Sequence, residues 1–196
     1  MKIDKRLNFV LPVTRVDGTE IYIHSTPIDS NCFRTYYRVL AKAFSVVMWE
    51  LGPMSGPRVA DKVLEDVATE MGQWETEPGG AAGVKQGLIA DIQRRTSVVA
   101  PSDRGWEPIP YHEAVQRQIL EPDDVAEVGS ALVFFTAGSH MFRERERSMM
   151  LSALKHWSAR IESSNATEFA NFLSTSTAVA STGERPPTSS PTPSNG

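Results

Sequence analysis

The last 23 residues, from Ser174 to Gly196, differ from the rest of the chain and limit where a fold can form. Fifteen of them are Ser, Thr or Pro, and Val179 is their only large aliphatic residue. A segment with so little apolar surface cannot bury enough of it to offset the entropy lost on ordering. The sequence therefore predicts a disordered tail or linker over residues 174–196 and one folded domain over residues 1–173.

Composition narrows the kind of partner that this domain can have. Hydrophobic residues make up 40% of the chain, enough for a core, and the formal net charge is −4. A negative balance argues against a surface built to bind phosphates, so we expect no nucleic-acid partner. No run approaches the roughly 18 apolar residues of a membrane span, so we expect no membrane partner and a cytosolic protein.

The N-terminal region predicts a β-hairpin followed by a long helix. Large apolar side chains stand at every second position of residues 7–14, namely Leu7, Phe9, Leu11 and Val13. Asp17-Gly18 supplies turn chemistry, and residues 19–24 return as a second strand. Thr26 is the expected N-cap of the helix, with Pro27 in its first turn. Apolar residues then recur every three or four positions to Leu51, where Gly52-Pro53 ends the pattern.

Further periodic segments indicate that most of the remaining body is helical. Helices are predicted over residues 56–71, 84–95, 111–120, 121–141, 149–157 and 166–173, and residues 98–109 are compatible with a small second hairpin. The expected fold class is α+β and mainly helical, with the N-terminal hairpin packed on a helical bundle. The disordered C-terminal tail completes this prediction.

Motifs for catalysis or cofactor binding are weak throughout the sequence. The four histidines lack the spacing of a helical metal site, and Gly79-Gly80-Ala81-Ala82-Gly83 lacks the pattern of a phosphate loop. Asp123-Asp124 can be a carboxylate pair, although acids at a helix start are favoured without any catalytic task. Cys32 is better explained as an inert core thiol than as a reactive one. We therefore expect no catalytic, cofactor or metal site, and no enzyme.

Aromatic and sulfur-containing side chains leave two interpretations open. Trp and Met residues can fill the core, which is favoured for each of them, or they can line an adaptable groove for a partner. The group comprises Trp49, Trp74, Trp106, Trp157, Met141, Met149 and Met150. The run from Leu132 to Phe135 is apolar on all sides of a helix, which indicates deep burial or a partner surface.

Several segments together resemble the tail assembly chaperones of long-tailed bacteriophages. The similarity covers most of the chain and consists of general sequence features without any catalytic motif. Its segments are Leu7–Val13, Asp17–Thr19, His24–Asp29, Gly56–Ala60, Gly87–Ile92, Ala131–Thr136, Asn165–Ala170 and the Ser/Thr-rich end.

This resemblance implies a protein of the host cytoplasm that is not an enzyme. Such chaperones bind the long helical tape-measure protein, keep it soluble, help to recruit tail-tube protein, and leave before the virion is complete. In many of these phages a ribosomal frameshift appends a second domain, and residues 174–196 have the composition of a joint between the two. Homo-oligomerisation stays open.

Contact residues can be chosen only from amphipathicity, and the alternative is that the same side chains pack the domain's own core. The candidates are Phe134, Phe135, Met141, Met149, Met150 and Trp157. A different class of function also stays open, namely a structural virion protein such as a minor tail or head–tail connector component. Such a protein would remain in purified particles.

Overall fold

The structure, a computed structural model, describes residues 7–75, 82–142, 146 and 158–181 and has an α+β fold. Its antiparallel sheet has five strands in the order β4-β3-β2-β1-β5. The strands are β1 (Asn8–Thr14), β2 (Glu20–Ser25), β3 (Thr96–Ser102), β4 (Gly105–Pro110) and β5 (Arg160–Glu162). The α-helices are α1 (Ser30–Ser45), α2 (Gly52–Ser55), α3 (Ala60–Glu70), α4 (Ala90–Arg94), α5 (Tyr111–Gln116), α6 (Pro122–Met141) and α8 (Ala166–Ser181).

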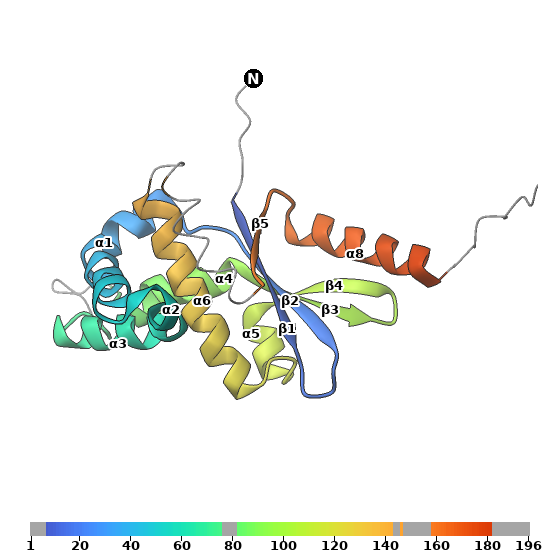
Figure 1. Ribbon diagram of the computed structural model, residues 1–196, viewed down its shortest axis with the longest axis horizontal. Coiled ribbons are helices and arrows are strands. Elements are labelled where there is room, and N and C mark those ends of the chain that lie inside the picture. Colours follow the sequence, from blue (N-terminus) through green and yellow to red (C-terminus); the bar gives the residue numbers. More distant parts are fainter. Residues whose placement is uncertain (1–6, 76–81, 143–145, 147–157, 182–196) are drawn as a thin grey trace, which may run out of the picture.

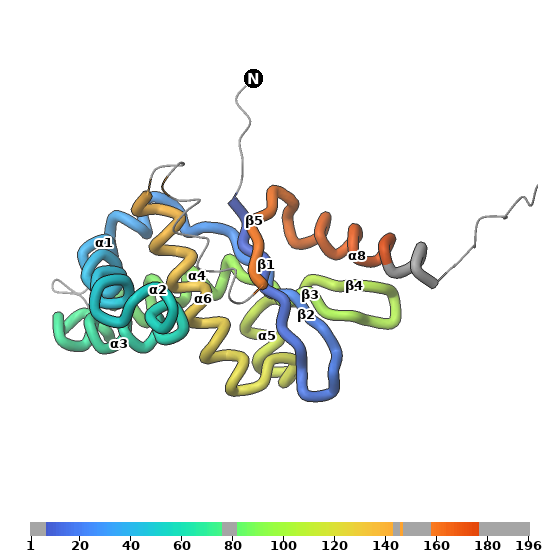
Figure 2. Tube along the Cα trace, viewed as in Figure 1, coloured from blue at the N-terminus to red at the C-terminus, as the bar shows by residue number. Residues whose placement is uncertain are grey.

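Three short helical turns of other geometry connect these elements. The turns η1 (Val46–Glu50) and η3 (Lys85–Ile89) are π-helical, and η2 (Gly56–Val59) is a 3-10 turn. Figure 1 shows α1, α2, α3 and α6 together at one end of the molecule, whereas α8 lies along β3 and β4 at the other end. The tube in Figure 2 has the same arrangement.

The predicted N-terminal hairpin is present at the expected residues. β1 pairs with β2 from Phe9 opposite Ser25 to Thr14 opposite Glu20. Between the strands, the backbone N–H of Thr19 donates to Oδ1 of Asp17 (2.8 Å), and Gly18 has φ +82°. The Asp-Gly pair therefore makes the turn that its chemistry favours.

The second hairpin is also present, and it joins the first in one sheet. β3 pairs with both β2 and β4, and the short strand β5 adds to β1 on the opposite edge. Neither this union nor β5 follows from local sequence patterns, because the partners lie far apart along the chain. The hairpin is therefore part of a wider sheet than the sequence alone predicts.

The start of α1 differs from the sequence-based prediction. Asp29, not Thr26, is the N-cap, and one carboxylate oxygen accepts from the backbone N–H groups of Asn31 (2.9 Å) and Cys32 (2.8 Å). The backbone N–H of Thr26 instead donates to the carbonyl of Arg95 (3.1 Å), which holds Thr26 beside α4. Residues 26–28, which were expected at the start of the helix, are therefore a connecting segment before it.

The sheet has a different core on each face. On one face, Phe9, Leu11, Ile23 and Val98 belong to the main core with α1, α3 and α6, and the Phe9 ring stacks on Phe135 with centroids 5.0 Å apart. On the other face, a smaller cluster joins the sheet to α8. Its buried members are Val10, Val99, Phe169 and Ala170. This alternation follows the period of two in β-strands.

The helix α8 corrects the predicted boundary of the tail. It continues through Ser181, so residues 174–181, expected to be disordered, are helical. The hydroxyls of Ser174, Thr175 and Ser176 each donate to the carbonyl four residues earlier, which satisfies these polar groups within the helix. The rest of the predicted tail, 182–196, lies outside the described residues.

No helix within the described ranges combines the length and the apolar character needed to cross a bilayer.

Candidate functional site

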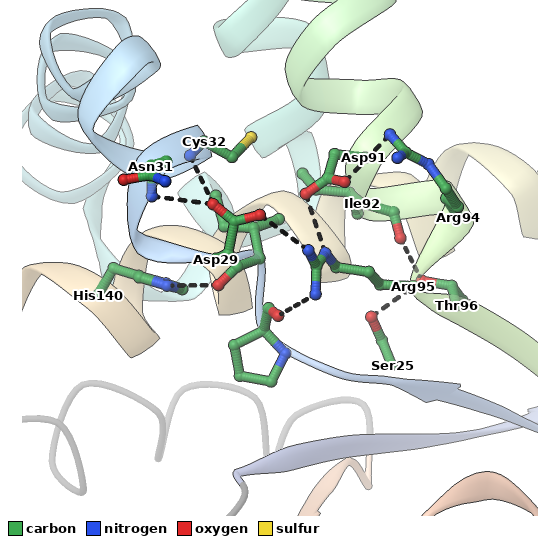
Figure 3. Close-up of polar contacts among 12 residues, drawn as sticks. Ser25, Asp29, Asn31, Cys32, Asp91, Ile92, Arg94, Arg95, Thr96 and His140 are labelled. Carbon is green, nitrogen blue, oxygen red and sulfur yellow. Dashed lines mark hydrogen bonds and ion pairs between the residues drawn. The ribbon is translucent and has the colours of Figure 1, made fainter.

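A network of polar contacts connects the start of α1 with the ends of α4 and α6 (Figure 3). Arg95, which follows α4, donates to Asp91 (2.9 Å) and to Asp29 (3.0 Å). On the other side, the Nε2–H of His140, near the end of α6, donates to the carbonyl of Ile28 (2.9 Å). These contacts fix the segment before α1 from two directions.

The chemistry of this network favours a structural role. Burial and the neighbouring carboxylate of Asp91 raise the pKa of the Cys32 thiol to about 11, which disfavours the reactive thiolate at neutral pH. The pKa of Asp29 is lowered, first by the backbone N–H of Cys32, so its charge serves the helix cap. Within the described ranges, no group of three or more His, Cys, Asp or Glu side chains is placed to hold a metal ion.

A cavity of about 260 Å³ lies between β1 and the first turns of α6. Two acids, Asp124 and Glu127, line it together with Ser158 and residues 11–14. Asp124 accepts from the backbone N–H of Glu121 (3.2 Å) and forms a capping box with that residue. Helix capping therefore explains Asp124, and Asp123 lies beside it in the first turn, where an acid is favoured without any catalytic task.

An apolar corner follows α1, and we define it as the exposed side chains of Trp49, Leu51, Met54 and Val59. Gly52 has φ +79°, a conformation that favours glycine, and it ends the helical run after η1. Gly56 then packs so closely on the backbone of Val47 that a Cβ would overlap the Val47 carbonyl. The chain therefore folds back on itself within a few residues.

Because of this fold-back, some side chains of residues 46–60 are buried in the core and others are exposed to solvent. Val47, Pro57 and Ala60 are buried, whereas the four residues of the apolar corner are exposed, Trp49 by 84% and Met54 by 68%. Other exposed large apolar residues lie elsewhere, for example Val16 in the turn between β1 and β2, Tyr37 on α1 and Phe172 on α8. Clustered exposed apolar side chains that include Trp are typical of protein-binding surfaces.

The contact candidates chosen from sequence do not form one surface in the described part of the chain. Phe134 and Phe135 are each 1% exposed and pack in the main core, Phe134 against Phe44 and Phe135 against Phe9. Met141 is half-buried against the same core. For the two phenylalanines the alternative, core packing, is what the structure has. Met149, Met150 and Trp157 lie outside the described residues.

Sequence reasoning missed the apolar corner because it favoured a core position for Trp49. Continued at about 3.6 residues per turn, the helical period instead places Trp49 on the side of Arg34, Arg38 and Lys42, opposite the buried stripe of α1. The signals that were available are this spacing and Gly52-Pro53, which marks where the helical run ends.

The chain was compared with protein-family models, with curated proteins and with solved structures, and none of the three comparisons finds a match.

Proposed function

We propose that this protein is a bacteriophage tail assembly chaperone. In this role it binds the tape-measure protein through the apolar corner, keeps it soluble, helps to recruit tail-tube subunits, and is absent from the finished virion. It acts in the host cytoplasm and catalyses no reaction. The observation that carries the proposal is the exposure of Trp49 and Met54 on a tightly packed fold-back, together with the sequence resemblance described above.

A chaperone of this kind has to cover an exposed apolar surface. A long apolar helix aggregates unless its surface is covered until tube subunits surround it. An exposed Trp beside Met and aliphatic side chains can cover part of a helix, because Met adapts to different partner shapes and Trp contributes a large contact area. The Cys32 thiol and the network around Arg95 lend no comparable support to an enzyme.

Co-expression with the tape-measure protein of the same phage tests this function. We expect the tape-measure protein to be soluble and to co-purify with this chain, and we expect mass spectrometry to find none of this chain in purified particles. Replacement of both Trp49 and Met54 by Ala should lower the soluble fraction. Phe172→Ala is the matched control, since Phe172 is 64% exposed on α8.

The opposite result identifies the other class of function. If the tape-measure protein neither binds nor becomes soluble, and this chain is found in mature particles, a structural role as a minor tail or connector component replaces the chaperone.

A further inference from the structure

Basic side chains extend the apolar corner along the exposed face of α1. Arg34, Arg38 and Lys42 are four residues apart and exposed, and this spacing places them on one face of the helix. Continued at the helical period, Trp49 falls on the same side, and Arg58 lies in η2 next to Val59. These exposed residues define a strip that is basic along α1 and apolar in the turns after it.

The charge of this region is opposite to that of the whole chain. Residues 30–59 contain four basic residues and one acid, Glu50, although the chain has a formal net charge of −4. Lys42 is paired with Glu70 (2.7 Å), whereas no ion pair joins Arg34 or Arg38 to another residue in the described ranges. Two arginines are therefore available to acids on a partner.

We infer that this strip binds an acidic amphipathic helix of a protein partner. The inference rests on the proposed function and specifies the partner segment: its apolar side chains cover Trp49 and Met54, and its Asp or Glu side chains face Arg34 and Arg38. Trp49 lies fifteen positions after Arg34, about 22 Å along a helix, so the bound segment has at least four turns. Arginine selects carboxylates through its fork of N–H donors.

A protein partner is favoured over an anionic membrane. A helix that lies on a membrane presents a long apolar face to the lipid, but the apolar face of α1 is buried in the main core through Tyr36, Leu40 and Phe44. The exposed apolar side chains are confined to the compact corner after the helix, and the net charge of the chain is repelled by anionic lipid.

The test measures binding of designed peptides to the full chain by fluorescence anisotropy. The probe is a labelled helical peptide of about five turns with a Leu face and Glu on its other positions. A matched peptide carries Lys in place of Glu. The variants are R34E with R38E, and Trp49→Ala. Their controls are R104E with R117E, which reverse two charges outside α1, and Phe172→Ala, an exposed aromatic residue on α8.

We expect the Glu peptide to bind the wild-type chain and the Lys peptide to bind at least about tenfold more weakly. The R34E and R38E pair and Trp49→Ala should each weaken binding of the Glu peptide about tenfold. The effect of the arginine pair should become smaller as the salt concentration rises. The control variants should bind the Glu peptide as the wild type does. Equal binding of the two peptides, or no effect of the arginine pair, overturns the inference. Binding to phosphatidylserine vesicles but not to the Glu peptide overturns it in favour of a membrane.

The same variants separate this inference from the proposed function. If the R34E and R38E pair and Trp49→Ala still keep the tape-measure protein soluble, the chaperone function stands and the surface is wrong. If the peptide results are as expected but the tape-measure protein is not bound, the surface stands and the chaperone function fails.

Discussion

His24 is 2% exposed, and the centroid of its ring lies 6.1 Å from that of Phe169 in α8. The Nε2–H donates to the carbonyl of Ser164 (2.9 Å), which also accepts from Nδ2 of Asn8 (2.6 Å). Burial lowers the pKa of His24, although the Ser164 carbonyl and the charge of Glu162 act in the opposite direction. The folded protein therefore keeps this ring neutral more strongly than the unfolded chain does.

This residue should make the protein less stable in mild acid. The unfolded chain takes up a proton at His24 as the pH falls through about 6.5, while the folded chain resists it, so stability is lost in that range. His24→Gln keeps a donor for Ser164 but cannot titrate. We expect the urea unfolding midpoint of this variant to fall less between about pH 7.5 and about pH 5.5 than the midpoint of the wild type does.

His112→Gln is the control for this prediction, because His112 is exposed on α5. It should keep the pH dependence of the wild type. If His24→Gln loses as much stability in acid as the wild type, His24 is not the group responsible.

Gly87 shows why some single residues could not be interpreted from sequence. In a helical segment glycine weakens the prediction of a helix, yet Gly87 lies in the π-helical turn η3, where a Cβ would overlap the ring of Tyr36. The hydroxyl of Tyr36 donates to the carbonyl of Ala82 nearby (2.8 Å). The requirement for glycine comes from a residue 51 positions away, so residue spacing within the segment does not reveal it.

At the scale of elements, α8 depends on one aromatic side chain for its attachment to the sheet. Phe169 is buried, contacts Tyr22 edge-on with ring centroids 5.3 Å apart, and lies under the guanidinium of Arg160 at 5.3 Å. One turn later, the backbone N–H of Trp106 donates to the hydroxyl of Ser174 (3.0 Å). Phe172, between these positions, points to solvent and contributes little packing.

Phe169→Ala should therefore loosen α8 from the sheet. The free energy of unfolding should fall by about 3 kcal/mol, the usual loss for a buried Phe, and that of Phe172→Ala should change by less than about 0.5 kcal/mol. Urea unfolding gives these values, and amide hydrogen exchange at Trp106 reports the local contact. Exchange at Trp106 should be faster in Phe169→Ala; equal exchange in both variants would show that α8 is held by other contacts.

The elements divide into those that local sequence determines and those that it does not. Both hairpins were predictable, since alternation and the Asp17-Gly18 turn act over a few residues. The addition of β5 to β1 was not, because it depends on pairing between Val10 and Arg160, which are distant along the chain. The extension of α8 past Leu173 was missed because residues 174–196 were judged by their small apolar surface, whereas the hydroxyls of Ser174 and Thr175 bond to carbonyls within the helix.

At the scale of the whole molecule, the sheet and the helices share one core through aromatic stacking. Phe135 of α6 stacks on Phe9 of β1, and Phe134 of the same helix stacks on Phe44 of α1 at 5.6 Å. The helix α6 thus contacts the sheet and the other helices with neighbouring side chains. Because α6 joins both parts, we expect the sheet and the helices to unfold together.

Phe135→Ala tests this expectation and also the role of Phe135. If Phe135 packs the shared core, its loss should lower the free energy of unfolding by about 3–5 kcal/mol, and Phe135→Leu should cost less, about 1.5 kcal/mol. Urea unfolding followed by circular dichroism and by Trp fluorescence should then give one coincident transition for each variant. Two separate transitions would mean that the sheet and the helices are independent units. If the urea midpoint of Phe135→Ala is unchanged and binding of the tape-measure protein is weaker, Phe135 belongs to the partner surface instead.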